Sequence, residues 1–141
     1  MNFIIRNYSE SDKKDIIQLW QDCGLIVPWN DPQRDIERKL SVQPELFLIG
    51  LINDTIIATA MVGYEGHRGW VNYLAVEPKF QRQGVGKQMM EEAEHRLLNL
   101  GCPKIQVQMR NTNAGVIKFY RKLGYLQDEV VNLGKRLISD E

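Results

Sequence analysis

The fold of this chain is decided by residues 73–90, Tyr-Leu-Ala-Val-Glu-Pro-Lys-Phe-Gln-Arg-Gln-Gly-Val-Gly-Lys-Gln-Met-Met. The stretch begins inside a strand, since residues 70–76 are apolar and rich in β-forming side chains and Pro78 ends the run. It ends inside a helix that we expect to start near Val85 and to reach Leu100. The apolar face of this helix is predicted to hold Val85, Met89, Ala93, Leu97 and Leu100, which recur at helical spacing.

The turn between strand and helix, residues 81–86, reads Gln-Arg-Gln-Gly-Val-Gly and is flanked by the cations Lys79 and Lys87. A glycine-bearing turn at a helix N-terminus leaves backbone N–H groups unpaired, and the helix dipole adds to their attraction for an anion. We therefore predict a phosphate site here. The turn lacks the glycine and Ser/Thr positions of a P-loop and the third glycine of a Rossmann fingerprint.

Composition indicates one ordinary globular domain over residues 1–141. Apolar residues make up 43% of the chain and charged residues 26%, with 18 acidic and 18 basic side chains. This balance gives no basic excess for nucleic acid, and no run reaches the ~20 apolar residues of a membrane helix. We therefore expect no nucleic-acid or membrane partner. Cys23 and Cys102 stand apart without metal-ligand spacing, so we expect no metal site and a cytoplasmic protein.

The remaining elements can be placed by periodicity and by their capping residues. A helix is expected after the cap Ser9, and a second, with a thin apolar stripe that suits the surface, between Asp31 and Pro44. A last helix is expected between a cap at Asn113 or Thr112 and the terminator Gly124. Strands are predicted at 2–6, 46–52, 55–64, 70–76 and 104–109, with one or two more within 125–138. The order β-α-α-β-β-β-α-β-α-β(-β) predicts an α/β (α+β) fold, a mixed central sheet with helices on both faces.

The turn resembles the pyrophosphate loop of the GCN5-related N-acetyltransferases (GNAT), whose signature is [QR]-x-x-G-x-[GA]. A second feature follows at the expected separation: Asn113-x-x-Val116-x-x-Phe119-Tyr120-x-x-Leu123-Gly124-Tyr125 is similar to N-x-x-A-x-x-x-Y-x-x-x-G-[FY]. The stretch at 28–32 and the C-terminal residues resemble the small bacterial YpeA-type subgroup. The resemblance covers essentially the whole chain and implies the GNAT acyl-CoA N-acyltransferase fold.

The resemblance implies acetyl-CoA as cofactor. The turn would bind its pyrophosphate, the central strand would pair with its pantetheine arm, and a backbone N–H near Leu74 would polarise the acetyl carbonyl. The implied cofactor-binding residues are Leu74, Ala75, Val76, Gln81, Arg82, Gln83, Gly84, Val85, Gly86, Lys87, Asn113 and Tyr120.

The implied activity is transfer of the acetyl group to a primary amine by direct attack on the thioester. Tyr120 would protonate the leaving thiolate, or it could simply be a core residue of its helix. Several relatives carry a glutamate in the central strand, and this strand has none. The nearest candidates for a general base are Glu65 and His67, and a water held by Asn72 or Tyr73 is the alternative.

The acceptor is expected near the proline-bounded loop that precedes the second helix. Candidate acceptor-binding residues are Trp29, Asn30, Asp31, Asn72 and Tyr73, although Trp29 could equally pack its loop onto the sheet. The acceptor could be a small-molecule amine, a peptide or protein N-terminus, or a lysine, and a homodimer is possible. The alternative function is a non-catalytic acyl-CoA-binding or sensing domain that retains the turn without a base.

Overall fold

The computed structural model describes residues 2–141, which separate into two compact units. The first unit holds residues 2–107 together with Asp140 and Glu141, and the second holds Gln108–Ser139. The single domain expected over residues 1–141 stays a prediction.

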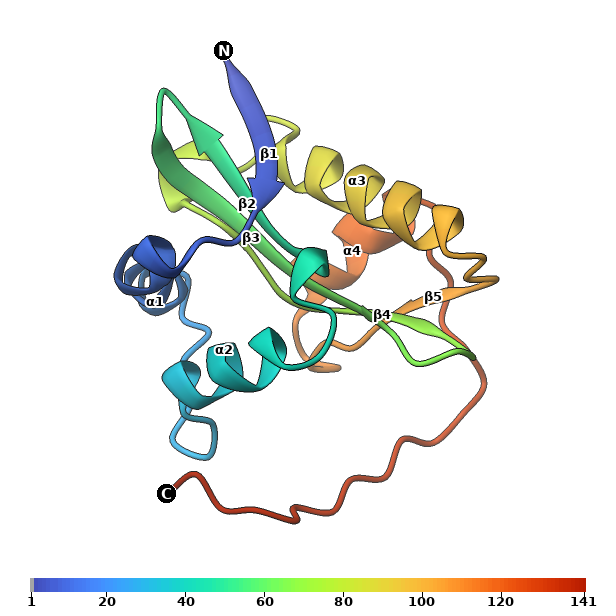
Figure 1. Ribbon diagram of the computed structural model, residues 1–141. Coiled ribbons are helices and arrows are strands. Elements are labelled where there is room, and N and C mark those ends of the chain that lie inside the picture. The colour runs from blue at the N-terminus through green and yellow to red at the C-terminus, as the bar shows by residue number, and fades with distance from the viewer. Residues whose placement is uncertain (1) are drawn as a thin grey trace. The chain divides into compact units, whose positions relative to one another are not determined.

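The first unit is built on a five-stranded sheet with the strand order β1-β2-β3-β4-β5 (Figure 1). The strands are β1 (Phe3–Asn7), β2 (Phe47–Ile52), β3 (Thr55–Tyr64), β4 (Gly69–Val76) and β5 (Ile105–Val107). Neighbours from β1 to β4 are antiparallel, whereas β5 runs parallel to β4. Asn53 and Asp54 both have positive φ, 49° and 64°, so the predicted tight turn between β2 and β3 is confirmed.

Helices cover both faces of this sheet, as predicted. Figure 1 shows α1 (Lys13–Asp22) and α2 (Pro32–Leu40) on one face and α3 (Val85–Asn99) on the other. Short 3₁₀ turns precede α1, β2 and the turn before α3, at η1 (Glu10–Asp12), η2 (Pro44–Leu46) and η3 (Pro78–Phe80). Asp31 caps α2 by accepting hydrogen bonds from Gln33 N and Arg34 N, with Pro32 as its first helical residue.

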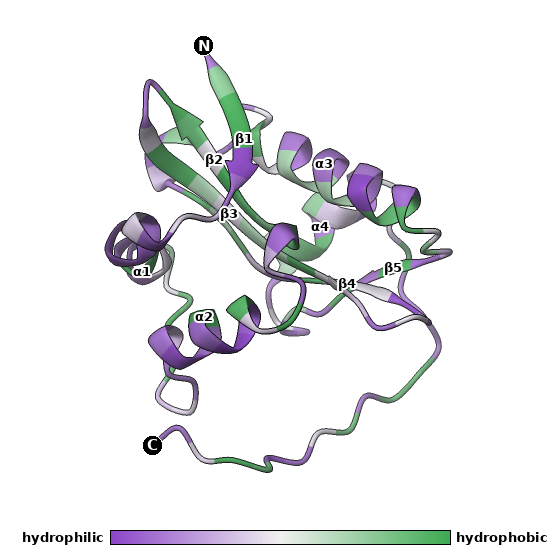
Figure 2. Ribbon diagram, viewed as in Figure 1, coloured by the Kyte–Doolittle hydropathy of each residue, from purple (hydrophilic) through white to green (hydrophobic). Residues whose placement is uncertain are grey.

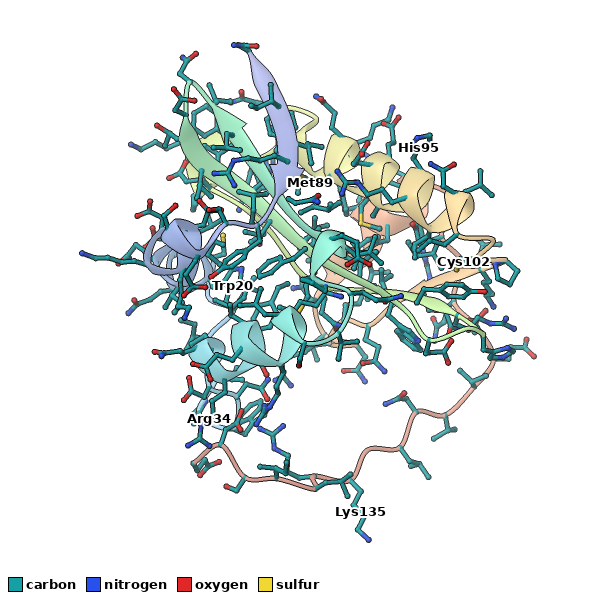
Figure 3. The ribbon with its side chains drawn as sticks, in the orientation of Figure 1. Trp20, Arg34, Met89, His95, Cys102 and Lys135 are labelled. Atoms are coloured by element: carbon teal, nitrogen blue, oxygen red, sulfur yellow. The ribbon has the colours of Figure 1, made fainter. Side chains whose placement is uncertain are left out.

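Large side chains of both α1 and α2 pack into the core between these helices and the sheet. Trp20 is fully buried, and its Nε1–H donates to Thr59 Oγ1 at 2.9 Å (Figure 3). Ile36 of α2 is also fully buried. α2 thus lies at the surface with Gln33, Arg34, Glu37 and Arg38 exposed, and the expectation that it stays out of the core was wrong at Ile36. The cluster consists of Ile16, Leu19, Trp20, Ile36, Phe47, Ile49, Leu51 and Ala75.

The opposite face of the sheet carries α3, whose buried side chains are Val85, Met89, Met90, Ala93 and Leu97. Leu100, predicted for this face, is 51% exposed because the helix ends at Asn99 and Gly101 takes φ 82°. Gly50 of β2 permits the close approach. A Cβ there would stand 3.0 Å from Met89 Sδ and 2.8 Å from the Phe3 ring. Figure 2 shows the apolar strands between these more polar helices.

The second unit contains α4 (Ala114–Lys122), which begins and ends as predicted. Asn113 caps it by accepting a hydrogen bond from Val116 N at 3.2 Å, and Gly124 follows it with φ 95°. The one or two strands predicted within 125–138 are absent from the described residues. A segment becomes a strand only where another strand supplies hydrogen bonds, and no ladder of the described chain includes this one.

Candidate functional site

The turn before α3 has the geometry of an anion site. Gly84 is the helix N-cap with φ 84°, a left-handed conformation that glycine adopts without strain. The first bond of the helix runs from Gln88 N to Gly84 O, so the preceding amide groups have no helical carbonyl to bind. The first turn holds no acidic residue. A Cβ added at Gly84 would meet nothing within 4 Å, so the space over these donors is open to a phosphate.

Two glutamine side chains hold this turn in place. Gln81 Nε2 donates to Val76 O at 3.0 Å, and Gln83 Nε2 donates to Lys79 O at 3.2 Å. Gln81 therefore ties the turn to the end of β4. Both residues are predicted to bind the cofactor, and both use their side-chain amides here to fix the shape of the loop.

The second half of β4 has an open edge. The ladder to β5 contains three pairs, Gly69↔Ile105, Trp70↔Gln106 and Val71↔Val107, whereas β4 continues to Val76. Within residues 72–76, Asn72, Ala75 and Val76 pair with β3 on one side, and no strand of the described chain lies on the other. An extended ligand arm can pair with such an edge in the manner of an added strand. The edge leads into the turn at 81–84, which joins the two predicted parts of the cofactor site.

Within the same half of β4 the strand bulges at Tyr73. The register with β3 shifts between Thr59 and Met61, and Tyr73 takes φ 51°. Its carbonyl accepts a hydrogen bond from Thr59 Oγ1 at 2.8 Å, and its ring stacks on Trp20 with centroids 3.8 Å apart. The hydroxyl reaches α2 and donates to Asp35 Oδ2 at 2.6 Å. Burial, followed by the hydrogen bond to Asp35, raises the pKa of Tyr73, so the phenol stays protonated.

The N-terminal half of α2 is held by the end of the chain. The Asp140 carboxylate is fully buried: it accepts from Asp31 N at 2.9 Å and from both Arg38 terminal nitrogens, at 2.7 and 3.1 Å. Arg38 also contacts Asp35 at 3.3 Å. A polar network therefore runs from the β4 bulge through α2 to the C-terminus. Trp29, in the loop that precedes α2, is 47% exposed. Figure 3 shows Arg34 at the same end of α2.

The two predicted base candidates lie in the exposed loop between β3 and β4. The Glu65 carboxylate accepts from the backbone N–H groups of Arg68 and His67, the latter at 2.6 Å. These bonds lower the pKa of Glu65, Arg68 first and His67 second, which weakens it as a proton acceptor. His67 is exposed. Their catalytic roles stay predictions.

Tyr120 lies on α4 with a buried ring. It makes edge contacts with Phe119 and Tyr125, at centroid distances of 5.0 and 5.4 Å. Burial raises the pKa of Tyr120 to about 12. Its hydroxyl forms no hydrogen bond within residues 2–141, and every fully buried side-chain polar atom there is partnered, so this oxygen is accessible. A protonated hydroxyl without an internal partner suits a proton donor.

The structure thus joins the predicted turn, the β4 residues and the α2 cap on one unit, and it places Asn113 and Tyr120 on the other. Sequence reasoning missed Asp35, Arg38 and Asp140. Asp35 and Arg38 sit three residues apart on a polar helix, a signal too common to single out, and Asp140 carries no local signal. The described residues contain no cluster of His, Cys, Asp and Glu able to hold a metal, and none of their helices is long and apolar enough to cross a membrane.

Comparison with known proteins places this arrangement among acetyltransferases. The Acetyltransferase (GNAT) family matches residues 13–125. An acetyltransferase of Yersinia pestis (strain Pestoides F) is 44% identical over 137 residues, 97% of each chain. The NatC complex bound to Gag peptide and CoA superimposes with a TM-score of 0.79 at 19% identity, covering 92% of this chain and 87% of its own. AAC(6')-Iy with the bisubstrate analogue CoA-S-monomethyl-acetylneamine also gives 0.79 at 19% identity, with 96% and 99% covered.

Proposed function

The chain belongs to the acetyltransferase (GNAT) family and is an N-acetyltransferase that uses acetyl-CoA, and we propose that it transfers the acetyl group to a primary amine by direct attack on the thioester. One observation carries the proposal: the glycine-capped, acid-free start of α3 adjoins the open edge of β4. Acetyl-CoA supplies the activated acyl group. The residues of the chain bind it, orient the amine and move two protons.

The binding role is assigned to the turn and the strand edge. Backbone N–H groups at 84–87 bind the pyrophosphate, and the helix dipole with Arg82 and Lys87 adds positive potential. Backbone groups of Leu74, Ala75 and Val76 pair with the extended arm of the cofactor. Val76 O already accepts from Cys23 Sγ at 3.2 Å and from Gln81 at 3.0 Å, so the N–H groups of this edge and the Leu74 carbonyl carry most of the pairing.

Proton transfer needs an acceptor for the amine proton and a donor for the thiolate. Tyr120 is the proposed donor, since its hydroxyl is protonated and finds no hydrogen-bond partner among residues 2–141. For the amine proton we favour a water bound by Asn72 and Tyr73 over Glu65. Tyr73 brings the carboxylate of Asp35 to the strand that lacks one of its own, whereas the Glu65 carboxylate is already bound by its own loop.

The proposed acceptor-binding residues are Trp29, Asn30 and Asp31, with Asn72 and Tyr73 on the strand. Exposed Trp29 offers an apolar surface beside the proposed acceptor. The two structural neighbours hold a peptide and a neamine conjugate, which supports an amine acceptor without choosing its size.

The experiment is a panel of small amines, aminoglycosides and peptides incubated with acetyl-CoA, with free thiol release as the readout. We expect release that depends on both the enzyme and one amine class, with the acetylated product confirmed by mass. Thermal shift with CoA alone is the control for cofactor binding. A CoA-dependent shift with no thiol release from any amine would contradict the transfer reaction and favour a binding or sensing domain.

A further inference from the structure

The carboxylate of Asp140 is fully buried against α2, although Asp140 is 102 positions from Arg38 in the sequence. A charge removed from water is strongly destabilising unless it is paired and its oxygens are hydrogen-bonded. Both oxygens of Asp140 are. Oδ1 accepts from Arg38 Nη2 at 2.7 Å, and Oδ2 accepts from Arg38 Nη1 at 3.1 Å and from Asp31 N at 2.9 Å. Arg34 Nη1 adds a second positive charge, 3.8 Å from Oδ1.

Arg38 lies between two carboxylates and binds them unequally. Both of its terminal nitrogens reach Asp140, whereas only Nη1 reaches Asp35, where it donates to Oδ1 at 3.3 Å. The other Asp35 oxygen, Oδ2, accepts the hydroxyl of Tyr73 at 2.6 Å. The two oxygens of Asp35 are therefore divided between the guanidinium and the phenol.

This division depends on Asp140, because Arg38 could otherwise bind the whole Asp35 carboxylate. Residues three apart on a helix are neighbours, and a guanidinium favours two parallel hydrogen bonds to one carboxylate. Such a contact would engage both oxygens of Asp35, including the one that accepts from Tyr73. The Arg38 side chain is 44% exposed, which leaves it room to turn toward Asp35.

We propose that Asp140 is a positioning residue for the amine side of the reaction: by binding Arg38 it keeps one oxygen of Asp35 for Tyr73, and by binding Asp31 N it fixes the end of the acceptor loop. The inference rests on the proposed function, in which Tyr73 holds the water that takes the amine proton and Asp31 borders the acceptor. None of these hydrogen bonds reaches the cofactor turn at 81–87, so CoA binding should not depend on Asp140.

The first test is Asp140→Asn, which removes the charge and keeps a side-chain oxygen for Asp31 N. With the most active amine of the panel, kcat/KM should fall about tenfold, the effect of one charge-assisted hydrogen bond, and CoA affinity by calorimetry should not change. Asp54→Asn is the matched control. It removes the same charge from the exposed turn between β2 and β3 and should leave both quantities at their wild-type values.

A second measurement reads the contact of Tyr73 with Asp35 without any substrate. In protein isotope-labelled at tyrosine Cζ, the NMR signal of Tyr73 is assigned by its loss in Tyr73→Phe, and its position reports the hydrogen bond of the phenol. Asp140→Asn should move this signal, because Arg38 then competes with Tyr73 for Asp35. Asp54→Asn should not.

A double variant, Asp140→Asn with Arg38→Gln, tests the competition itself. Without the guanidinium nothing draws Asp35 away from Tyr73, so the Tyr73 signal and kcat/KM for the amine should both return toward wild type. A purely structural defect of Asp140→Asn would not be reversed by a second loss of a side-chain charge. The double variant also buries no unpaired charge, so it remains informative if the single variant does not fold.

An unchanged Tyr73 signal in Asp140→Asn would overturn the proposal, as would a double variant in which the signal stays displaced. A displaced signal with wild-type amine kinetics would overturn it as well, since the contact would then not serve the acceptor. Absence of amine-dependent thiol release from the wild-type protein would instead contradict the proposed function, and the Tyr73 signal would still decide whether Asp140 positions Asp35.

Discussion

The Tyr73 hydroxyl donates a hydrogen bond of 2.6 Å to Asp35 Oδ2, which connects the bulge of the central strand to the helix that borders the candidate acceptor site. The bond joins residues 38 positions apart. It orients a strand side chain and a helix carboxylate at once, since the Tyr73 ring also stacks on buried Trp20.

Replacing Tyr73 by Phe should keep the stacking on Trp20 and remove only the hydrogen bond. We expect a loss of about 1–3 kcal/mol in the free energy of unfolding, because the lost partner is a carboxylate, and a raised KM for the amine. Urea unfolding and steady-state kinetics measure the two effects. Tyr64→Phe is the control, since that hydroxyl meets Gly66 O on the surface at 3.2 Å. Equal stability of the two variants would show that the bond to Asp35 contributes nothing.

Gly84 can be used to test the phosphate site with two variants of nearly equal shape. Gly84→Asn and Gly84→Asp share the strain of φ 84°, and only the second adds a negative charge above the helix start. CoA affinity by calorimetry should be about tenfold or more weaker in the Asp variant than in the Asn variant, since like charges ~4 Å apart repel by about 1–4 kcal/mol. Equal CoA affinity of the two variants would contradict a phosphate site at this turn.

Tyr120→Phe separates chemistry from packing. The ring contacts with Phe119 and Tyr125 are kept, and the hydroxyl makes no hydrogen bond to the described residues, so stability should change by less than ~0.5 kcal/mol. If the hydroxyl protonates the thiolate, kcat should fall by ~10-fold to 10³-fold with CoA affinity unchanged. Because the pKa of Tyr120 is raised to about 12, wild-type kcat should show no loss from its ionisation below pH ~10. Wild-type turnover in the Phe variant would exclude the donor role.

Asp12 gives a stability difference that depends on pH. Burial pushes its pKa upward, but the Arg6 guanidinium at 2.7 and 2.9 Å and the Ser9 N–H at 2.8 Å outweigh it, and the pKa lies below its ordinary value. A lowered folded-state pKa means stability that is present above the unfolded pKa of ~3.9 and is lost as pH falls through the folded value.

Asp12→Asn should therefore lower the free energy of unfolding by roughly 1–2 kcal/mol at pH 7. This figure is reduced because the Arg6 side chain is partly exposed to solvent. The difference from wild type should shrink below pH ~4. Urea unfolding at neutral and acid pH measures it. Glu10→Gln, whose carboxylate is exposed, should leave the free energy of unfolding close to that of wild type at both pH values. A constant difference across the range would show that the Asp12 charge is not responsible.

Local signals were enough to predict most elements. Asp31 before Pro32, Asn53-Asp54, Gly84 before Val85 and Asn113 act through bonds or dihedral angles within a few residues, so sequence alone places them. The phosphate turn belongs to this class, because the glycine, the helix start and the absence of nearby acids are all contiguous.

Tertiary structure decided the rest. The contact of Tyr73 with Asp35 and the burial of Asp140 under Arg38 depend on where α2 and the chain end come to lie, and no spacing rule encodes that. The segment at 126–138 is a second feature that the sequence alone could not settle. The sequence predicted one or two strands here, but a strand needs a hydrogen-bonding neighbour, and no strand of the described chain pairs with the segment. Sequence determines what a segment can pair with, and only the packed structure determines whether that partner lies within the same molecule.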